Sequence, residues 1–245
     1  MKIYERSYLR TNRDTVTVSS GDDLKANLYD NTTLFSWVSI GEAAGTSTIT
    51  LKLDFSLELD RLVLQGINWK DYTIDHSADG ISWTNAFTIT SNTDSYGIHD
   101  VTVTKQYWRF QITARQVVGD ETICAQILLL KSLFTLTPNG IKPVQIEKKN
   151  IVTLADAGTN KNLIGKKTEI TSSWVDARGS ELTNINSLMN KTFVITITDN
   201  ADTAEAPLWR AYDYFEMVTV NNNNFEFNGG FEGTGIKQKL VCRET

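Results

Sequence analysis

The segment YTIDHSADGISW, residues 72–83, places a histidine, a serine and two aspartates close together. Nucleophilic catalysis would require His76 and Ser77 to converge on one reacting atom, with an aspartate orienting the histidine. Successive side chains of a β-strand point to opposite faces of the sheet, so His76 and Ser77 cannot pair if this segment is a strand. The Asp79 and Gly80 that follow are typical of a tight turn. The pattern therefore predicts a strand and a turn, and we expect no enzymatic activity.

The short segment GINWKDY before this strand carries side chains that suit a shallow carbohydrate site. Tryptophan can stack on the apolar face of a sugar ring, while neighbouring polar groups bind its hydroxyls. A tryptophan between two strands can instead plug the open end of a sandwich core, and this alternative is the commoner one. The candidate carbohydrate-binding residues are Asn68, Trp69, Lys70 and Asp71, together with His99 from the segment SYGIHD.

The composition limits the classes of partner. The chain has 245 residues and a formal net charge of −5, and its 24 lysines and arginines are scattered. We expect no nucleic-acid partner, because such proteins gather basic residues into a patch. No apolar run approaches the roughly 20 residues that span a bilayer, and the N-terminal MKIYERSYLR lacks an apolar core. We therefore expect no membrane insertion and no ordinary signal peptide.

Apolar and polar residues alternate through the first half of the chain, which is typical of half-buried strands. In YWRFQITAR, Arg109 falls on the face opposite to Trp108 and Phe110. In STITLKLDF, one face carries Ile49, Leu51, Leu53 and Phe55. Further strands are expected at about 61–66, 71–77, 86–90, 98–104 and 122–131, at the spacing of an antiparallel β-sandwich.

The segment TPNGIKP holds the strongest turn signals in the chain, so residues 136–144 are interpreted as a linker between domains 1–135 and 145–245. Beyond it, strand patterns recur in TEITSSWV, TFVITIT, YFEMVTV and IKQKLVC. Between the first two, the apolar residues of GSELTNINSLMN recur at helical spacing. The sequence thus predicts a mainly β fold, with an N-terminal β-sandwich and a C-terminal β-domain that has one α-helix.

The order of motifs in the first half resembles the discoidin, or coagulation-factor type C, galactose-binding-like domain. The likeness covers about residues 15–133 and includes ANLYDNTTLFSW, ITLKLDF, YWRFQIT and ICAQILLL. Its most specific part is the pattern Tyr-x-Ile-x-x-Ser-x-Asp-Gly-x-x-Trp, which ends at Trp83. The resemblance implies an eight-stranded jelly-roll β-sandwich whose relatives bind glycans, lipids or proteins through loops at one end.

The same resemblance implies a structural calcium ion, which family members hold with the loop corresponding to NLYDNTT and a glutamate near the start of the last strand. Asp30 and Thr33 fit the first part of this site. Gln126 occupies the approximate glutamate position, which removes a charged ligand for a hard cation. The loop around Trp69 is also shorter than in many sugar-binding relatives and carries no arginine. We expect no cofactor, with structural calcium as the open alternative.

The second half resembles the ring-forming β-domain of phage distal-tail (baseplate hub) proteins. This likeness is carried by Trp174 before a leucine-containing helix in TEITSSWVDARGSELTNINSLMN, followed by KTFVITITDN, LWRAYDYFEMVTV and GIKQKLVCRE. It implies a homo-oligomeric ring whose heterologous contacts close around an axis. It also implies other phage tail proteins as partners and a place in the virion.

These patterns lead to one principal expectation and two alternatives. The principal one is a structural component of a phage tail or baseplate, which oligomerises through its C-terminal domain and carries a galactose-binding-like module for protein or host-glycan contacts. The first alternative is an extracellular carbohydrate-binding protein that contacts a cell-surface glycan. The second is an accessory fragment of a larger sugar-degrading enzyme. A ring-sized oligomer would favour the principal expectation, and a strict monomer with glycan affinity would reject it.

Overall fold

The structure is a computed structural model. It describes residues 2–30, 35–42, 45–135, 140–153 and 159–177, and beyond them 180, 183–184, 187–188, 195–198, 215–219, 226–227 and 236–244. The chain divides into two compact units. The first, Tyr4–Leu133, is called the sandwich unit here; the second combines Met1–Ile3 with Phe134–Thr245 and is called the second unit.

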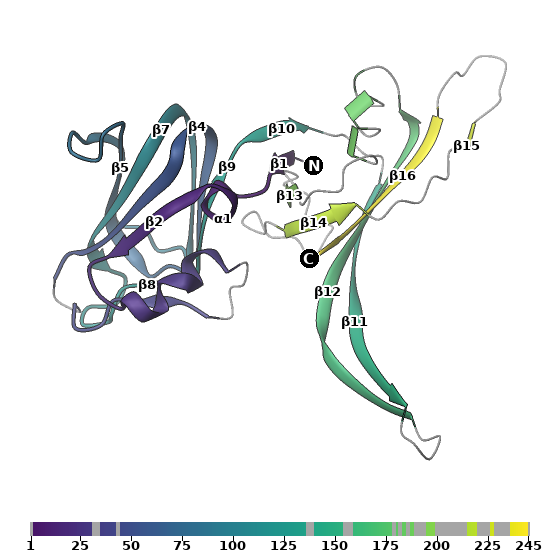
Figure 1. Ribbon diagram of the computed structural model, residues 1–245, viewed down its shortest axis with the longest axis horizontal. Coiled ribbons are helices and arrows are strands. Elements are labelled where there is room, and N and C mark those ends of the chain that lie inside the picture. The colour runs from purple at the N-terminus through teal and green to yellow at the C-terminus, as the bar shows by residue number, and fades with distance from the viewer. Residues whose placement is uncertain are drawn as a thin grey trace. The chain divides into compact units, whose positions relative to one another are not determined.

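The sandwich unit contains eight strands in two antiparallel sheets (Figure 1). The larger sheet has the order β2-β4-β7-β5-β6, with β9 paired to β4, and β3 pairs with β8. Its strands are β2 (Arg13–Val18), β3 (Trp37–Val38), β4 (Ser47–Gln65), β5 (Trp69–Ser77), β6 (Thr84–Ile89), β7 (Tyr96–Arg115), β8 (Ile123–Cys124) and β9 (Gln126–Leu130). Helix α1 (Tyr8–Thr11) and the 3-10 helix η1 (Asp22–Tyr29) precede and follow β2.

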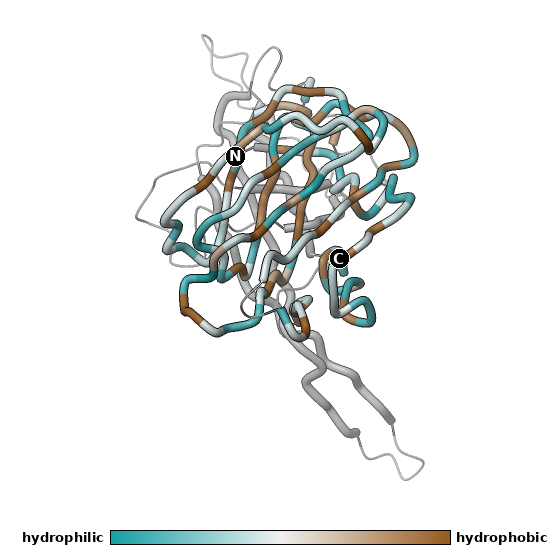
Figure 2. Tube along the Cα trace, turned by 90° about the vertical axis from the view of Figure 1, so that its left-hand side faces the viewer, coloured by the Kyte–Doolittle hydropathy of each residue, from teal (hydrophilic) through white to brown (hydrophobic). Residues whose placement is uncertain are grey.

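Apolar and polar residues alternate along the strands of this unit, as the sequence predicted, and the apolar ones form its core. Figure 2 shows the alternation in colour. Ile49, Leu51 and Leu53 are fully buried, and so are Trp108 and Phe110. β4 and β7 are each one long strand where two shorter strands were predicted. Their register shifts between Lys52 and Leu57. A shift of this kind breaks the period of two, so Phe55, which was predicted to share the buried face, is instead 53% exposed.

Most of an eight-stranded sheet belongs to the second unit; the sheet has the order β10-β1-β13-β14-β16-β12-β11, and β15 pairs with β16. Its strands are β1 (Lys2–Glu5), β10 (Ser132–Thr135), β11 (Gly140–Thr153), β12 (Thr159–Ala177), β13 (Ile195–Thr198), β14 (Phe215–Thr219), β15 (Glu226–Phe227) and β16 (Ile236–Glu244). Each of the four segments predicted to be strands after residue 145 overlaps one of these strands. The prediction of a mainly β fold is confirmed.

Two features of this unit differ from the sequence prediction or lie beyond it. β11 begins at Gly140, inside the segment interpreted as a linker, and Pro143 pairs with Ile170 of β12. A proline is tolerated there because β11 ends the sheet and needs no further donor on its outer side. The helix predicted in GSELTNINSLMN falls largely outside the described residues, although 183–184 and 187–188 are helical.

Candidate binding site

The tryptophan predicted to stack on a sugar lies in the core of the sandwich unit. Trp69 begins β5 and has an exposed fraction of 0%. Its ring meets Tyr72 edge-on at 5.3 Å between centroids and lies 6.1 Å from Phe110. Its indole nitrogen donates a hydrogen bond of 2.8 Å to the Ile123 carbonyl. These contacts are those of a core plug, and they leave no face of this ring open to a ligand.

The polar neighbours of Trp69 are largely engaged in holding loops. The Asn68 carboxamide donates to the Glu121 carbonyl at 2.8 Å and accepts from the Ile123 amide at 3.0 Å. One Asp71 carboxylate oxygen accepts the Ser91 amide at 2.7 Å. Both side chains therefore join the start of β5 to neighbouring loops, and each already uses hydrogen-bonding capacity that a ligand would need.

The remaining two predicted residues lie in different surroundings. Lys70 is exposed at the start of β5. His99 is half-buried on β7, where Nε2 lies 3.2 Å from the Tyr72 hydroxyl and the ring packs 4.9 Å from that of Phe87. Burial lowers the pKa of His99 to about 4. His99 therefore makes interior contacts, and only Lys70 of the five residues is classed as exposed.

Arg115 fixes the loops at this end of the sandwich. The residue is 6% exposed, and its guanidinium donates at 2.7 Å to the Thr122 hydroxyl, the Ser47 hydroxyl and the Glu42 carbonyl. It also donates to the Gly45 carbonyl. One buried cation thus connects the β3–β4 loop to the segment after β7.

The outer face of the large sheet offers a different group of side chains. Across β4, β5 and β7, polar residues alternate with the fully buried ones, so they point away from the core. Cross-strand pairing aligns them in rows, with Arg109 opposite both Asp75 and Thr50, and Tyr107 opposite both Ser77 and Lys52. The half-buried members of this face are Thr48, Thr50, Lys52, Thr73, Tyr107, Arg109 and Gln111.

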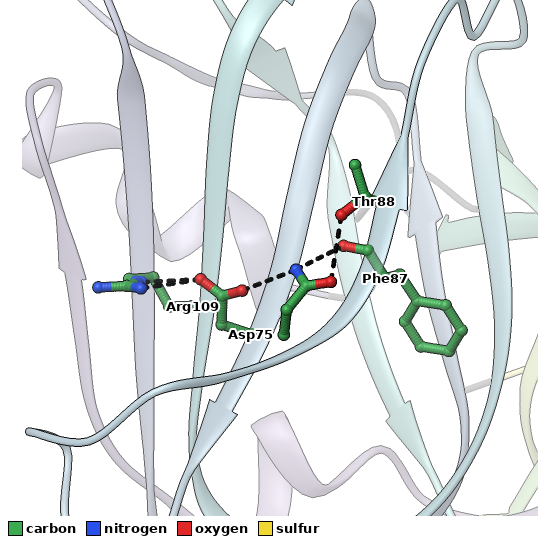
Figure 3. Close-up of polar contacts among 5 residues, drawn as sticks. Asp75, Phe87, Thr88 and Arg109 are labelled. Carbon is green, nitrogen blue, oxygen red and sulfur yellow. Dashed lines mark hydrogen bonds and ion pairs between the residues drawn. The ribbon is translucent and has the colours of Figure 1, made fainter.

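An ion pair at the centre of this face joins three strands. Both Nε and Nη2 of Arg109 donate to one oxygen of Asp75, at 3.2 and 2.8 Å. The other Asp75 oxygen accepts from the Asn85 carboxamide at 3.0 Å. Figure 3 shows the carboxylate between Arg109 and a chain of hydrogen bonds that continues to Phe87 and Thr88. The Asp75 side chain is only 8% exposed, whereas that of Arg109 is 26% exposed.

Trp83 lies against this arginine. The Arg109 guanidinium carbon is 4.4 Å from the centroid of the Trp83 ring, a cation–π contact, and Trp83 itself is half-buried. Arg109 is therefore fixed on one edge by a carboxylate and on one face by an indole. Such a group meets a ligand with little loss of side-chain freedom.

The turn between β5 and β6 sets the position of Trp83. One Asp79 oxygen accepts the backbone amides of Ser82 and Ile81, both at 2.8 Å, and these bonds lower the pKa of Asp79 to about 2. Gly80 has a φ of +74°, which favours glycine. A Cβ at Gly80 would lie 2.9 Å from the Tyr107 ring. The predicted turn is confirmed, and it also provides the surface on which Tyr107 packs.

Two hydrogen-bond donors at this centre have no partner within the described residues. They are Nη1 of Arg109 and Nε1 of Trp83. Both oxygens of Asp75 are already hydrogen-bonded. The arrangement can therefore bind the oxygen atoms of a ligand beside an aromatic ring. Sequence reasoning placed Arg109 on the polar face but missed the site, because nothing in the sequence shows that β7 pairs with β5.

The residues suggested for calcium do not form a fitting site in the described part of the chain. Asp30 follows η1 and is exposed, and Thr33 lies outside the described residues. Gln126 is 4% exposed, and its amide nitrogen has no hydrogen-bond partner there. The described residues contain no cluster of three or more His, Cys, Asp or Glu side chains suited to a metal. Calcium also binds backbone carbonyls, and part of the candidate loop lies outside the described residues, so structural calcium stays an open prediction.

Solved structures similar to this chain include carbohydrate-binding modules, each matching about half of it. Chitosan-binding module 1 from a chitosanase/glucanase of Paenibacillus sp. IK-5 is 22% identical, with a TM-score of 0.45, and the match covers 51% of this chain and 98% of the module. CBM32-3 from a family 31 glycoside hydrolase of Clostridium perfringens is 22% identical, with a TM-score of 0.41, covering 49% and 89%. A pectin-binding module is 22% identical, with a TM-score of 0.40, covering 48% and 89%.

Neither family models nor curated proteins match the chain. The tail role, the ring and the virion location stay predictions. No helix in the described part of the chain is long and apolar enough to cross a membrane.

Proposed function

We propose that this chain is a non-enzymatic carbohydrate-binding protein and that its sandwich unit binds glycan on the outer face of the large sheet. The site is centred on Trp83, Tyr107 and Arg109. The observation that carries the proposal is the pairing of an aromatic ring with two unpartnered donors, Nε1 of Trp83 and Nη1 of Arg109. Sugar sites combine these two features, because rings stack on C–H faces while polar groups bind the oxygen atoms.

The surroundings of this centre support binding along a saccharide chain. Gln111 pairs with Thr48 and Thr73, and Thr50 pairs with Arg109, so amide and hydroxyl groups extend the face in both directions. Each of them can donate to or accept from a sugar hydroxyl. The same chemistry argues against glycoside hydrolysis at this place. That reaction uses two free carboxyl groups, whereas both oxygens of Asp75 are occupied.

Glycan binding by single-residue variants tests the proposal. A panel of immobilised oligosaccharides identifies the ligand, and calorimetry then gives its affinity. We expect Trp83→Ala to weaken binding by about tenfold or more, because a stacking ring and a donor are lost together. The matched control is Phe35→Ala, since Phe35 is 64% exposed and belongs to another loop.

Two results would contradict the proposed site. One is unchanged affinity in Trp83→Ala with circular dichroism that shows a folded protein. The other is a loss of binding in Lys70→Ala or Phe35→Ala while Trp83→Ala binds normally. Loss of binding in Lys70→Ala would place the glycan at the Trp69 loop that the sequence suggested, and loss in Phe35→Ala would place it at the loop before β3.

A further inference from the structure

At the centre of the outer face, hydrogen-bond donors are left free while the charged acceptors are occupied. Arg109 is a donor only, and so is the Trp83 indole. The adjacent carboxylate of Asp75 accepts three hydrogen bonds, two from Arg109 and one from Asn85. The Asn85 amide oxygen accepts from the Thr88 hydroxyl. The centre therefore offers free donors, and none of its charged acceptors is free.

A neutral sugar hydroxyl can accept a hydrogen bond from this centre, but it brings no charge to meet the guanidinium, and its proton needs an acceptor elsewhere on the face. A carboxylate brings acceptors only. Charge-assisted bonds from a guanidinium to a carboxylate are about twice as strong as neutral ones.

One end of the Arg109 guanidinium is not bonded to Asp75. Nε and one proton of Nη2 are used on Asp75, so the end of the guanidinium formed by Nη1 and the second proton of Nη2 stays available. That end has the fork shape that binds a carboxylate through two parallel bonds. Its 26% exposure keeps it within reach of solvent.

From this pattern we infer that the site selects an acidic glycan and that Arg109 binds the carboxylate of a uronic-acid sugar. This inference rests on the proposed function, because it assigns the ligand class of the same site. The sugar ring lies against Trp83, and its hydroxyls meet the amide and hydroxyl groups of Gln111 and Thr50. Asp75 acts as the positioning residue that holds Arg109 in its orientation.

The partners of the neighbouring charged groups support Arg109 as the residue that binds the ligand carboxylate. Lys52 lies on the same face but is paired with Asp14. Asp79, in the turn before Trp83, is committed to the backbone amides of Ile81 and Ser82. Among these charged groups, Arg109 is the one whose cation lies over the ring of Trp83.

The test compares an acid glycan with its neutral counterpart. Calorimetry measures the affinity for trigalacturonate, for its fully methyl-esterified form and for a neutral galactose trisaccharide. We expect the free acid to bind about 10- to 100-fold more tightly than the ester, the range for a charge-assisted bidentate contact. The preference should also shrink as salt rises.

The variants separate recognition from folding. Arg109→Gln alone leaves the buried Asp75 carboxylate without its cation, so the double variant Asp75→Asn with Arg109→Gln is made beside it. We expect the double variant to fold and to bind acid and ester equally. Arg61→Gln is the matched control, because Arg61 forms a separate ion pair, with Asp100, and should leave the preference unchanged.

Each outcome has one meaning. Equal affinity of the wild type for acid and ester, with binding lost in Trp83→Ala, overturns the acidic-ligand inference and leaves the proposed function standing. A preference for the acid that survives in the folded double variant overturns the role of Arg109. If no oligosaccharide on the panel or in calorimetry binds, the proposed function itself is rejected.

Discussion

Burial holds both histidines of the sandwich unit in their neutral form. The pKa of His76 is lowered by burial and by the charge of Lys105, and burial lowers that of His99 from 6.5 to about 4. His76 packs edge-on against Trp108, and His99 against Tyr72. Protonation of either ring would place a charge among aromatic side chains, so both residues make the fold sensitive to acid.

We predict that the sandwich unit loses stability between about pH 6.5 and pH 4 because of His99. Above pH 6.5 the residue is neutral in both states. Below that value the unfolded chain binds the proton first, so the free energy of unfolding falls until the folded pKa of about 4 is reached. The loss is on the order of 3 kcal/mol. Urea unfolding at several pH values measures it, and His99→Gln should flatten the profile; an equal slope in this variant contradicts the assignment.

The sequence shows which aromatic residues could contact a ligand, but it does not show which of them the fold buries. Trp69 and Trp83 both lie beside short polar segments, and the sequence made Trp69 the candidate ligand-binding ring while indicating that a core plug is its commoner role. The structure buries Trp69 and leaves Trp83 partly exposed beside Arg109. That difference depends on the pairing of β5 with β7, a contact between segments distant in sequence.

At the scale of elements, the loops at one end of the sandwich depend on a single buried cation. Arg115 donates to the β3–β4 loop and to Thr122, and Glu121 accepts the amides of Gly41 and Glu42. We predict that Arg115→Ala destabilises the unit by about 3 kcal/mol, because it leaves several buried acceptors unpaired.

Hydrogen exchange measures this effect locally. Amides in residues 39–42, 45–47 and 115–123 should exchange faster in Arg115→Ala, while those in the centres of β5 and β7 keep their relative protection. Uniform acceleration across the unit would mean that Arg115 supports the whole core and not these loops.

The alternation of apolar and polar residues predicted where strands occur but not how long they are. Ile49 to Leu53 and Trp108 to Phe110 were correctly given buried faces. The register shift that exposes Phe55 depends on how β4 bends against β7, and no local pattern encodes it. Pro143 shows the same limit. A proline predicts the end of a strand unless that strand is known to lie at the edge of its sheet, as β11 does.

At the scale of the whole molecule, the two units suggest separate tasks. The sandwich unit contains the candidate glycan site and a continuous core that includes Trp37, Trp69 and Trp108. We predict that a protein comprising residues 4–133 folds alone and binds glycan within about threefold of the full chain, since a unit of this size can bury its own core. Cooperative thermal unfolding and calorimetry test this; an unfolded product would show that the second unit is needed for folding.

The central claim is that glycan binds on the outer sheet face, and the most direct measurement is a titration followed by nuclear magnetic resonance. With 15N-labelled protein and trigalacturonate or the tightest ligand of the panel, the indole signal of Trp83 and the amides near Arg109 and Tyr107 should shift together and saturate. Signals of Lys70 and the loops fixed by Arg115 should stay in place. Shifts confined to those loops, with Trp83 and Arg109 unmoved, would contradict the account.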